Sequence, residues 1–313
     1  MGLFCLFCCP RGVLCSQYLY IMKKQGDMID YVVPMVFPQD KRWQNELNRV
    51  LQYKESATNA IRYRSWGTEE LLVRCIRKNL PWIRTIYIIL SGPSQVQEWM
   101  DNSQIRIVFH RDFMPADILP TYNSRAIEMY LHRIHGLADR FLYGNDDMFP
   151  LSPMQESDFF RDGLPCLCWK KKRYNADKSF HRACMNGFNF VAAEFGRHYD
   201  TEWMHIGHNV VPMLRSTCEM FWQRWPKRMQ ASVTRFRLPQ NYNQYIYSWW
   251  QILSGQYVKY EPVRSYISID NQVNEIVDAI RTAGGLLCIN DSEAVEDITN
   301  LSAIVRNEIE KRL

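Results

Sequence analysis

The sequence lacks three features that would assign a chain of this size to a class directly. None of its 313 residues belongs to an unbroken apolar run long enough to cross a bilayer. The excess of basic residues is small, 38 Lys and Arg against 33 Asp and Glu, so charge gives no argument for a nucleic-acid-binding protein. No fixed-period repeat is visible, which argues against solenoids and propellers. With 47% hydrophobic residues, the chain instead has the composition of a folded globular protein.

The ten cysteines do not indicate a disulfide framework, because such frameworks belong to small secreted chains. We expect mostly reduced, partly buried thiols in a cytoplasmic protein. Four of the cysteines lie in residues 1–27, an apolar leader that is broken by Pro10, Arg11 and Gly12. We predict that this leader is disordered or follows a misassigned start codon. Peripheral association with the inner face of the cytoplasmic membrane is the alternative.

Strand patterns and helix patterns alternate through the first half of the chain. The strand patterns are residues 29–36, 85–90, 104–110 and 140–144, and the helix patterns are residues 40–56, 68–79 and 124–134. This alternation predicts an α/β fold with a mostly parallel, Rossmann-like sheet flanked by helices. We assign residues 28–164 to this core. Residues 165–313 are expected to form a helix-rich second half, a cap that completes the same domain.

An acid pair, Asp146 and Asp147, directly follows the predicted strand at residues 140–144. Ligands of such sheets bind beyond the carboxyl ends of the strands. Two adjacent carboxylates suit a hard divalent cation, which would neutralise a diphosphate. A solvated turn in which Asp146 caps backbone amides fits the same residues equally well.

The second half contains candidates for a base and for a phosphate ligand. His208 has the ordinary pKa range of a general base, although six other histidines share it. Arg237 offers a planar fork that matches phosphate oxygens. A separate set of zinc-ligand types is formed by Cys166, Cys168, His181 and Cys184. Its CxC spacing is atypical of zinc sites, so ordinary buried thiols are the favoured interpretation.

Two long segments carry a family resemblance. Residues 62–90 (RYRSWGTEELLVRCIRKNLPWIRTIYIIL) and 118–149 (ILPTYNSRAIEMYLHRIHGLADRFLYGNDDMF) resemble the Stealth family of capsular-polysaccharide phosphotransferases. The animal relatives of this family are the lysosomal-enzyme N-acetylglucosamine-1-phosphotransferases. The resemblance continues at residues 29–36, 208–247 and 288–293, and so covers nearly everything from Ile29 to the end.

The resemblance implies a glycosyltransferase-A-like fold with a nucleotide-sugar-binding core. It implies transfer of a hexose- or N-acetylhexosamine-1-phosphate from a nucleotide sugar, a UDP-sugar being the expected donor, to a glycan hydroxyl in capsular or exopolysaccharide synthesis. The nucleoside monophosphate would leave. The implied cofactor is a divalent cation, Mg²⁺ or Mn²⁺.

The resemblance also implies roles for single residues. Asp146 and Asp147 match the acid pair of the family and would hold the metal and diphosphate, while Arg237 would bind phosphate and His208 would act as base or phosphate contact. Asp147, His208 and Arg237 are thus the predicted catalytic residues. The predicted substrate-binding residues are Asp40, Arg64, Asn123, Ser124, His132, Arg133 and Asn145.

Three positions depart from the family pattern. Phe37 lies where the family has a tryptophan and a polar residue, while Ser65 and Asn241 replace acids. Such changes near a diphosphate site would alter donor or metal use, or remove activity. Two alternatives therefore stay open: an ordinary nucleotide-sugar glycosyltransferase, and a non-catalytic homologue that binds a glycan or nucleotide.

Overall fold

A computed structural model describes residues 28–51, 63–292, 294–295 and 297–313. Several sequence predictions lie outside these residues: the leader at 1–27, the end of the helix predicted at 40–56, and Arg62 and Glu293 at the ends of two family segments.

The central sheet has five strands in the order β10-β4-β1-β2-β3. Its strands are β1 (Ile29–Pro34), β2 (Ile83–Leu90), β3 (Ile105–Phe109), β4 (Arg140–Tyr143) and β10 (Val211–Leu214). β1 to β4 run parallel, and β10 pairs antiparallel with β4. The predicted mostly parallel sheet is therefore confirmed.

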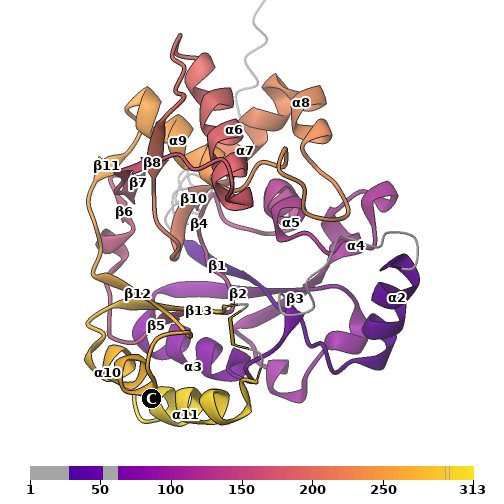
Figure 1. Cartoon of the computed structure of the whole chain (residues 1–313), viewed down its shortest axis with the longest axis vertical. Helices are drawn as coiled ribbons and strands as arrows, with labels where there is room; N and C mark the ends of the chain where they lie inside the picture. The colour runs from indigo at the N-terminus through magenta and orange to yellow at the C-terminus, as the bar shows by residue number, and fades with distance from the viewer. Residues whose placement is uncertain (1–27, 52–62, 293, 296) are drawn as a thin grey trace, which may run out of the picture.

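The apolar run of β1 has no polar face because both sides of the sheet are covered. Val32 packs into one hydrophobic core, whereas its neighbours Tyr31 and Val33 pack into another, and all three side chains are fully buried. Alternating side chains of a strand point to opposite faces, so each core receives every second residue. Figure 1 shows one group of helices on each side of the sheet.

The first group of helices packs below the sheets in Figure 1 and the second above them. The lower group is α3 (Glu69–Asn79), α10 (Val273–Thr282) and α11 (Thr299–Glu310), and the upper group is α5 (Ser124–Tyr130), α6 (Ser179–Ala193), α7 (Arg215–Arg224), α8 (Pro226–Ala231) and α9 (Tyr245–Ser254). The shorter α4 (His110–Phe113) follows β3, and α2 (Lys41–Leu51) lies at the side. In the described part of the chain, no helix combines the length and apolarity that a membrane span needs.

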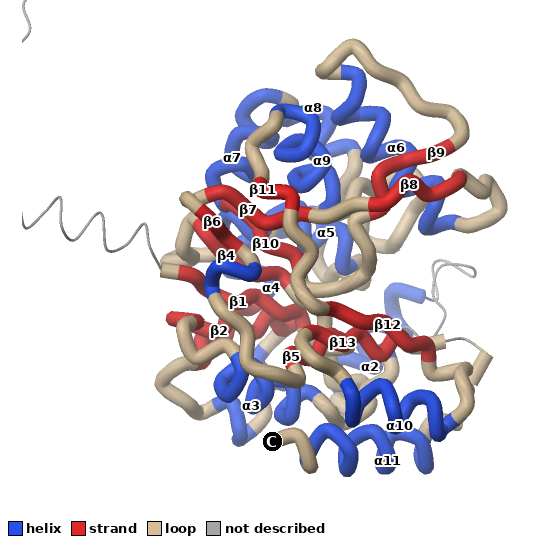
Figure 2. Tube along the Cα trace, turned by 90° about the vertical axis from the view of Figure 1, so that its left-hand side faces the viewer, coloured by secondary structure: helices blue, strands red, loops and turns tan. Residues whose placement is uncertain are grey.

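A second sheet lies beside the central one and joins distant parts of the sequence (Figure 2). Its order is β12 (Arg264–Ser268), β13 (Leu286–Asn290) and β5 (Met148–Pro150). The remaining strands are β6 (Phe160–Arg161), β7 (Leu164–Leu167) and β11 (Val258–Lys259) in a small sheet, and the hairpin of β8 (Lys170–Arg173) and β9 (Glu202–His205). The second half is helix-rich as predicted, and it also supplies β10, β12 and β13 to the two larger sheets.

One predicted helix ends early. The helix predicted at residues 124–134 is α5 followed by a 3-10 turn over Leu131–Arg133. The difference concerns a helix end, where the last turn is often 3-10. The last helix, α11, begins at Thr299, whose backbone N–H donates to the side chain of Asp297.

The strand order creates a switch point between β1 and β4. β2 and β3 follow β1 on one side, and β4 lies on its other side. In open α/β sheets, ligands bind in the crevice beyond the carboxyl ends of the strands at such a point. The segments that leave β1 and β4 there are residues 35–40 and 144–147.

Candidate active site

The acid pair lies where the chain passes from the central sheet to the second sheet. β4 ends at Tyr143, and β5 begins directly after Asp147. The carbonyl of Asp147 accepts a hydrogen bond of 2.9 Å from the backbone N–H of Ile289 in β13. Gly144 lies so close to Tyr31 that a Cβ atom there would be 2.2 Å from the tyrosine hydroxyl. The backbone hydrogen bond and the close approach of Gly144 to Tyr31 fix the path of the acid pair.

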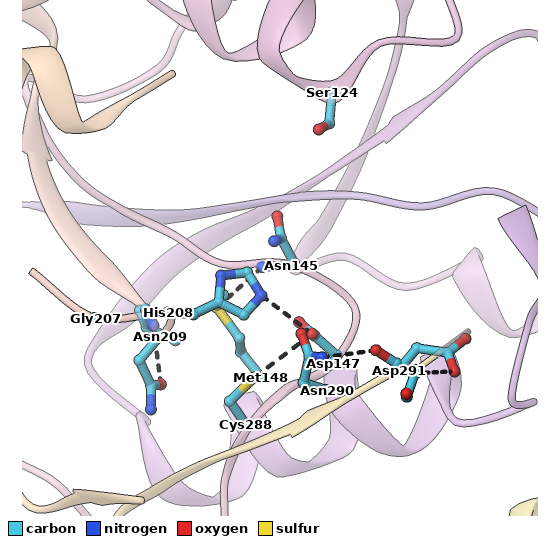
Figure 3. Close-up of polar contacts among 12 residues, drawn as sticks. Ser124, Asn145, Asp147, Met148, Gly207, His208, Asn209, Cys288, Asn290 and Asp291 are labelled. Carbon is cyan, nitrogen blue, oxygen red and sulfur yellow. Dashed lines mark hydrogen bonds and ion pairs between the residues drawn. The ribbon is translucent and has the colours of Figure 1, made fainter. Parts of the chain in front are cut away.

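Asp147, His208 and Cys288 form a compact polar centre (Figure 3). The Oδ2 atom of Asp147 lies 3.3 Å from His208 Nε2 and 3.5 Å from Cys288 Sγ. One ligand atom from each residue lies within 4.8 Å of the other two. The second carboxylate oxygen, Asp147 Oδ1, is buried without a hydrogen-bond partner. These three residues are called the Asp-His-Cys centre below.

The other two members of the centre are held by their neighbours. His208 follows Gly207, whose backbone has a φ of +93°, a conformation that favours glycine. The carbonyl of Gly207 accepts a 2.9 Å hydrogen bond from the Tyr245 hydroxyl. Cys288 lies in β13 directly opposite Met148 of β5. The centre is therefore built on paired strands and a tethered turn.

Charge and burial perturb the ionisable groups around the centre. Burial, together with the carboxylates of Asp147, Glu69 and Asp291, raises the pKa of Asp146 to about 8. Burial disfavours the imidazolium of His208, but the charge of Asp147 and its hydrogen bond outweigh that effect and raise the pKa of His208. Perturbed groups of this kind gather at functional sites.

The acid pair lines two hollows, and a third hollow next to them shares Ser124, Asn145 and Arg237 with one or the other. The acidic hollow is lined by Arg64, Glu69, Asp146, Asp147, Arg237 and Asp291, among others. The aromatic hollow is lined by Trp43, Tyr63, Tyr122, Ser124, Asn145 and both acids, among others. The large hollow, of about 590 Å³, is lined by Ser124, Glu128, Asn145, Lys172, His208 and Arg237, among others. A volume of this size is ordinary for a small-molecule site.

Arg237 lines both the acidic and the large hollow, and its guanidinium donates to the hydroxyl of Ser124. The loop that carries it is held by a buried amide pair. Asn123 caps α5 and donates a 3.0 Å hydrogen bond to Asn241, whose side-chain oxygen also accepts from the backbone N–H of Leu238 at 2.7 Å. Asn123 thus positions Ser124 and Arg237, and both the oxygen and the nitrogen of the Asn241 side chain are hydrogen-bonded within this part of the structure.

Arg64 lies in the acidic hollow, but its guanidinium forms a two-pronged ion pair with Asp291. The indole N–H of Trp66 donates to the same carboxylate at 3.3 Å. Ser65, the second departure, donates to Glu69 and accepts from the backbone N–H of Gly67, so it organises the turn before α3. Phe37, the third, is a buried core residue.

Four predicted substrate ligands lie outside these hollows: the buried Asn123, which caps α5, and Asp40, His132 and Arg133. Asp40 caps the start of α2, accepting from the backbone N–H of Arg42 at 2.9 Å and from Ser94. His132 and Arg133 pack against Trp222. These three residues line a separate surface hollow. The structure therefore brings together Asn145, Ser124 and Arg64 with the acids, His208 and Arg237. It places Asp40, His132 and Arg133 elsewhere, and Asn123 supports the site from a buried position.

Glu128 and Cys288 are polar residues that the structure brings to this place and that were not predicted from the sequence. Glu128 lines the large hollow, accepts from the backbone N–H of Gln244 at 3.0 Å and accepts from the Tyr143 hydroxyl at 3.3 Å. Burial raises the pKa of Glu128 to about 6. An acid within the apolar pattern of α5 was the available signal for it.

The zinc-ligand types at Cys166, Cys168, His181 and Cys184 do not converge. Cys168 contacts Glu261, and His181 accepts from the backbone N–H of Asn175. Within the described ranges, the residues that gather with metal-ligand spacing are those of the Asp-His-Cys centre. A buried carboxylate oxygen without a partner, beside imidazole and thiol, is a donor set that fits a divalent cation. Asp147 of the predicted metal pair belongs to this set.

The fold and the polar centre at its switch point define an α/β enzyme. Residues 62–166 match conserved region 2 of the Stealth proteins. The chain belongs to the Stealth family, as the curated relatives also indicate.

Those relatives are named as phosphotransferases. The chain is 27% identical to the receptor polysaccharide phosphotransferase WefC of Streptococcus gordonii, over 87% of this chain and 92% of the relative. It is 31% identical to the capsular polysaccharide phosphotransferase fcs1 of Haemophilus influenzae, over 67% of this chain and 60% of the relative. Among solved structures, it is similar to the galactosyltransferase LgtC in complex with donor and acceptor sugar analogs. That likeness has 11% identity and a TM-score of 0.44, and covers 90% of this chain and 95% of the other.

Proposed function

We propose that this protein transfers a sugar-1-phosphate from a nucleotide sugar to a hydroxyl of an acceptor glycan in capsular or exopolysaccharide synthesis. The names of its curated relatives support the reaction class. The observation that carries the proposal is the position of Arg237. This arginine lines both the acidic hollow beside the acid pair and the large hollow beside His208 and Glu128. A phosphorus atom there would have a cation beside it and room for a substrate on two sides.

The reaction requires one bond to form and one to break. The acceptor oxygen attacks the sugar-proximal phosphorus, the bond to the nucleoside monophosphate breaks, and the acceptor proton passes to a base. Because little covalent chemistry falls to the protein, catalysis consists of positioning and charge stabilisation. We assign Arg237 to the transferred phosphate, since its guanidinium fork fits two phosphate oxygens.

We assign the donor nucleotide to the aromatic hollow and the acceptor to the large hollow. Trp43, Tyr63 and Tyr122 contact one another edge to face, and all three line the aromatic hollow. Such rings suit a nucleobase, in keeping with the expected UDP-sugar. Asn145 and Ser124 line both hollows and would contact donor and acceptor alike.

Two side chains of the large hollow are candidates for the base. His208 has Asp147 to orient its imidazole and to stabilise the charge that it would gain. Glu128 is a buried carboxyl whose pKa of about 6 suits proton transfer near neutrality. The pH dependence of turnover separates the two.

A divalent cation is part of the proposal. Asp147, His208 and Cys288 would hold it, and Asp146 lies next to them in the chain. When bound, such an ion polarises phosphoryl oxygens and offsets the charge of a diphosphate. A cytoplasmic location at the inner face of the membrane stays a prediction, since it depends on the leader.

The test is the nucleotide that leaves. The full chain would be incubated with a panel of nucleotide sugars, divalent ions and glycan acceptors. We expect nucleoside monophosphate, with Asp147→Asn and Arg237→Ala each lowering its release by at least about 100-fold. Arg197→Ala, at an exposed arginine remote from the hollows, is the matched control. Release of the diphosphate would indicate ordinary glycosyl transfer, and release of neither nucleotide would indicate a binding protein.

A further inference from the structure

We propose that the Asp-His-Cys centre binds a zinc-class ion, Zn²⁺ or Co²⁺, in preference to the Mg²⁺ or Mn²⁺ that the family resemblance implies. The inference deepens the proposed function, on which it rests for the role of the ion, but the binding site itself is argued from the three side chains alone.

The donor atoms set this preference. Mg²⁺ takes oxygen ligands in octahedral geometry and keeps several waters, and Mn²⁺ likewise suits carboxylate, carbonyl and water. The centre instead offers one carboxylate oxygen, one imidazole nitrogen and one sulfur. Imidazole and thiolate are the ligands of zinc and its neighbours, and a carboxylate with a thiolate would balance the charge of a divalent ion.

Two of the three donor–donor distances agree with one ion shared by all three residues, and all three donor atoms lie within 4.8 Å of one another. Ordinary Zn–N and Zn–O bonds in tetrahedral geometry put the nitrogen and oxygen about 3.3 Å apart, and the longer Zn–S bond puts sulfur and oxygen about 3.6 Å apart. The corresponding separations are 3.3 Å between His208 Nε2 and Asp147 Oδ2, and 3.5 Å between Cys288 Sγ and Asp147 Oδ2. The N–O and the S–O separations therefore both have the length expected for two ligands of one tetrahedral ion.

The centre is also preorganised, which metal sites need. Asp147 directly precedes β5, and its carbonyl accepts from the backbone N–H of Ile289 in β13; the next residue, Met148, is paired with Cys288. His208 comes from a third segment, whose next residue, Asn209, donates to the backbone of Ser265 in β12 at 3.3 Å. Three protein ligands leave a fourth position open, as in catalytic rather than structural zinc sites.

This assignment has a consequence for the acceptor proton. An ion bound to His208 Nε2 takes the nitrogen that faces Asp147, so His208 is a ligand rather than the base. Glu128 is then the carboxyl of the large hollow that takes the proton.

The experiment measures binding without donor or acceptor. Metal-free full-length protein would be titrated by calorimetry with Zn²⁺, Co²⁺ and Mg²⁺, each alone, and the optical spectrum of the Co²⁺ form recorded. We expect one Zn²⁺ or Co²⁺ per chain, bound at least about 100-fold more tightly than Mg²⁺, and a thiolate-to-cobalt charge-transfer band.

Cys288→Ser is the decisive variant, because its hydroxyl can still donate to Asp147 while the sulfur is gone. We expect this variant to lose the charge-transfer band and at least about tenfold in Zn²⁺ affinity. Cys168→Ser, at a partly exposed thiol that contacts Glu261, is the control and should keep both. Matching thermal unfolding curves would show that both variants are folded.

Equal affinity for Mg²⁺ and Zn²⁺, or a Co²⁺ spectrum without the thiolate band, would overturn the inference. Either result leaves the proposed function standing. Conversely, a protein with the band but no release of nucleoside monophosphate would keep the metal site and lose the proposed function.

Discussion

Single residues at this site are perturbed by burial as much as by neighbouring charge. Glu128 and Asp146 are both carboxyls whose pKa values burial raises, to about 6 and about 8. Each is therefore able to bind a proton at a pH where an exposed acid could not. Such groups suit proton transfer, and they cost stability when they ionise.

The pH profile follows from Glu128. If its carboxylate is the base, kcat/KM should rise about tenfold per pH unit below about pH 6 and then level off. If His208 is the base, the rise should continue past its ordinary pKa of 6.5, since Asp147 raises that value. Glu128→Gln should lower turnover by at least about 100-fold. pH–rate profiles of the full-length wild-type protein and of Glu128→Gln decide between the two bases.

Stability provides the control for this variant. The pKa of Glu128 lies above its ordinary value of 4.5, so the folded state holds the proton longer than the unfolded state. The free energy of unfolding should therefore fall as pH rises from about 4.5 through about 6, and Glu128→Gln should flatten this part of the curve. A Glu128→Gln protein that is unfolded at pH 7 would invalidate its use as a test of catalysis.

Gly144 is the residue that lets the acid pair approach β1. A Cβ atom there would lie 2.2 Å from the hydroxyl and 3.0 Å from the ring of Tyr31, whose side chain is fully buried. Gly144→Ala should cost about 1–3 kcal/mol of unfolding free energy, measured by denaturant titration, and should lower activity by shifting the acids. Gly92→Ala is the matched control, because nothing lies within 4 Å of its added atom. Equal effects of the two changes would contradict this assignment.

At the scale of elements, a buried amide ties α5 to the loop of Arg237. Asn241 uses its oxygen to accept from Asn123 and Leu238, and its nitrogen to donate to the carbonyl of Ser232 at 2.7 Å. An acid has no such donor. The amide of Asn241, which departs from the family pattern, thus stabilises the loop through its hydrogen bonds.

Restoring the family's acid should therefore be harmful. Asn241→Asp should lose about 1–3 kcal/mol of stability at pH 7, because a carboxylate oxygen would face the Ser232 carbonyl without a proton between them. Asn271→Asp is the control, since it removes a similar side-chain donation, to Ser268, at an exposed position. Higher activity with unchanged stability in Asn241→Asp would show that this interpretation is wrong.

Elements with strong local signals were predictable from the sequence, and contacts between distant segments were not. The apolar run of β1 and the acidic first turn of α3 mark those elements clearly. β5 and β10 have three and four residues, too few for a periodic pattern, and they are defined by their pairing with β13 and β4. The same limit explains the site, since the contact between Cys288 and Asp147 spans 141 residues of sequence.

Across the whole molecule, the site lies where the central sheet, the second sheet and the upper helices meet. The acid pair comes from the first half of the chain, while His208, Arg237 and Cys288 come from the second. Neither half holds the polar centre alone. Under the proposed function, the aromatic and acidic hollows would hold the donor and the large hollow the acceptor, with Arg237 lining both the acidic and the large hollow.

The mass of the glycan product tests the proposed phosphoryl transfer most directly. A defined acceptor would be incubated with the donor that supports nucleotide release, and the product measured by mass spectrometry and ³¹P NMR. We predict an added sugar phosphate and one phosphodiester signal. An added sugar without phosphorus would contradict transfer of a sugar-1-phosphate.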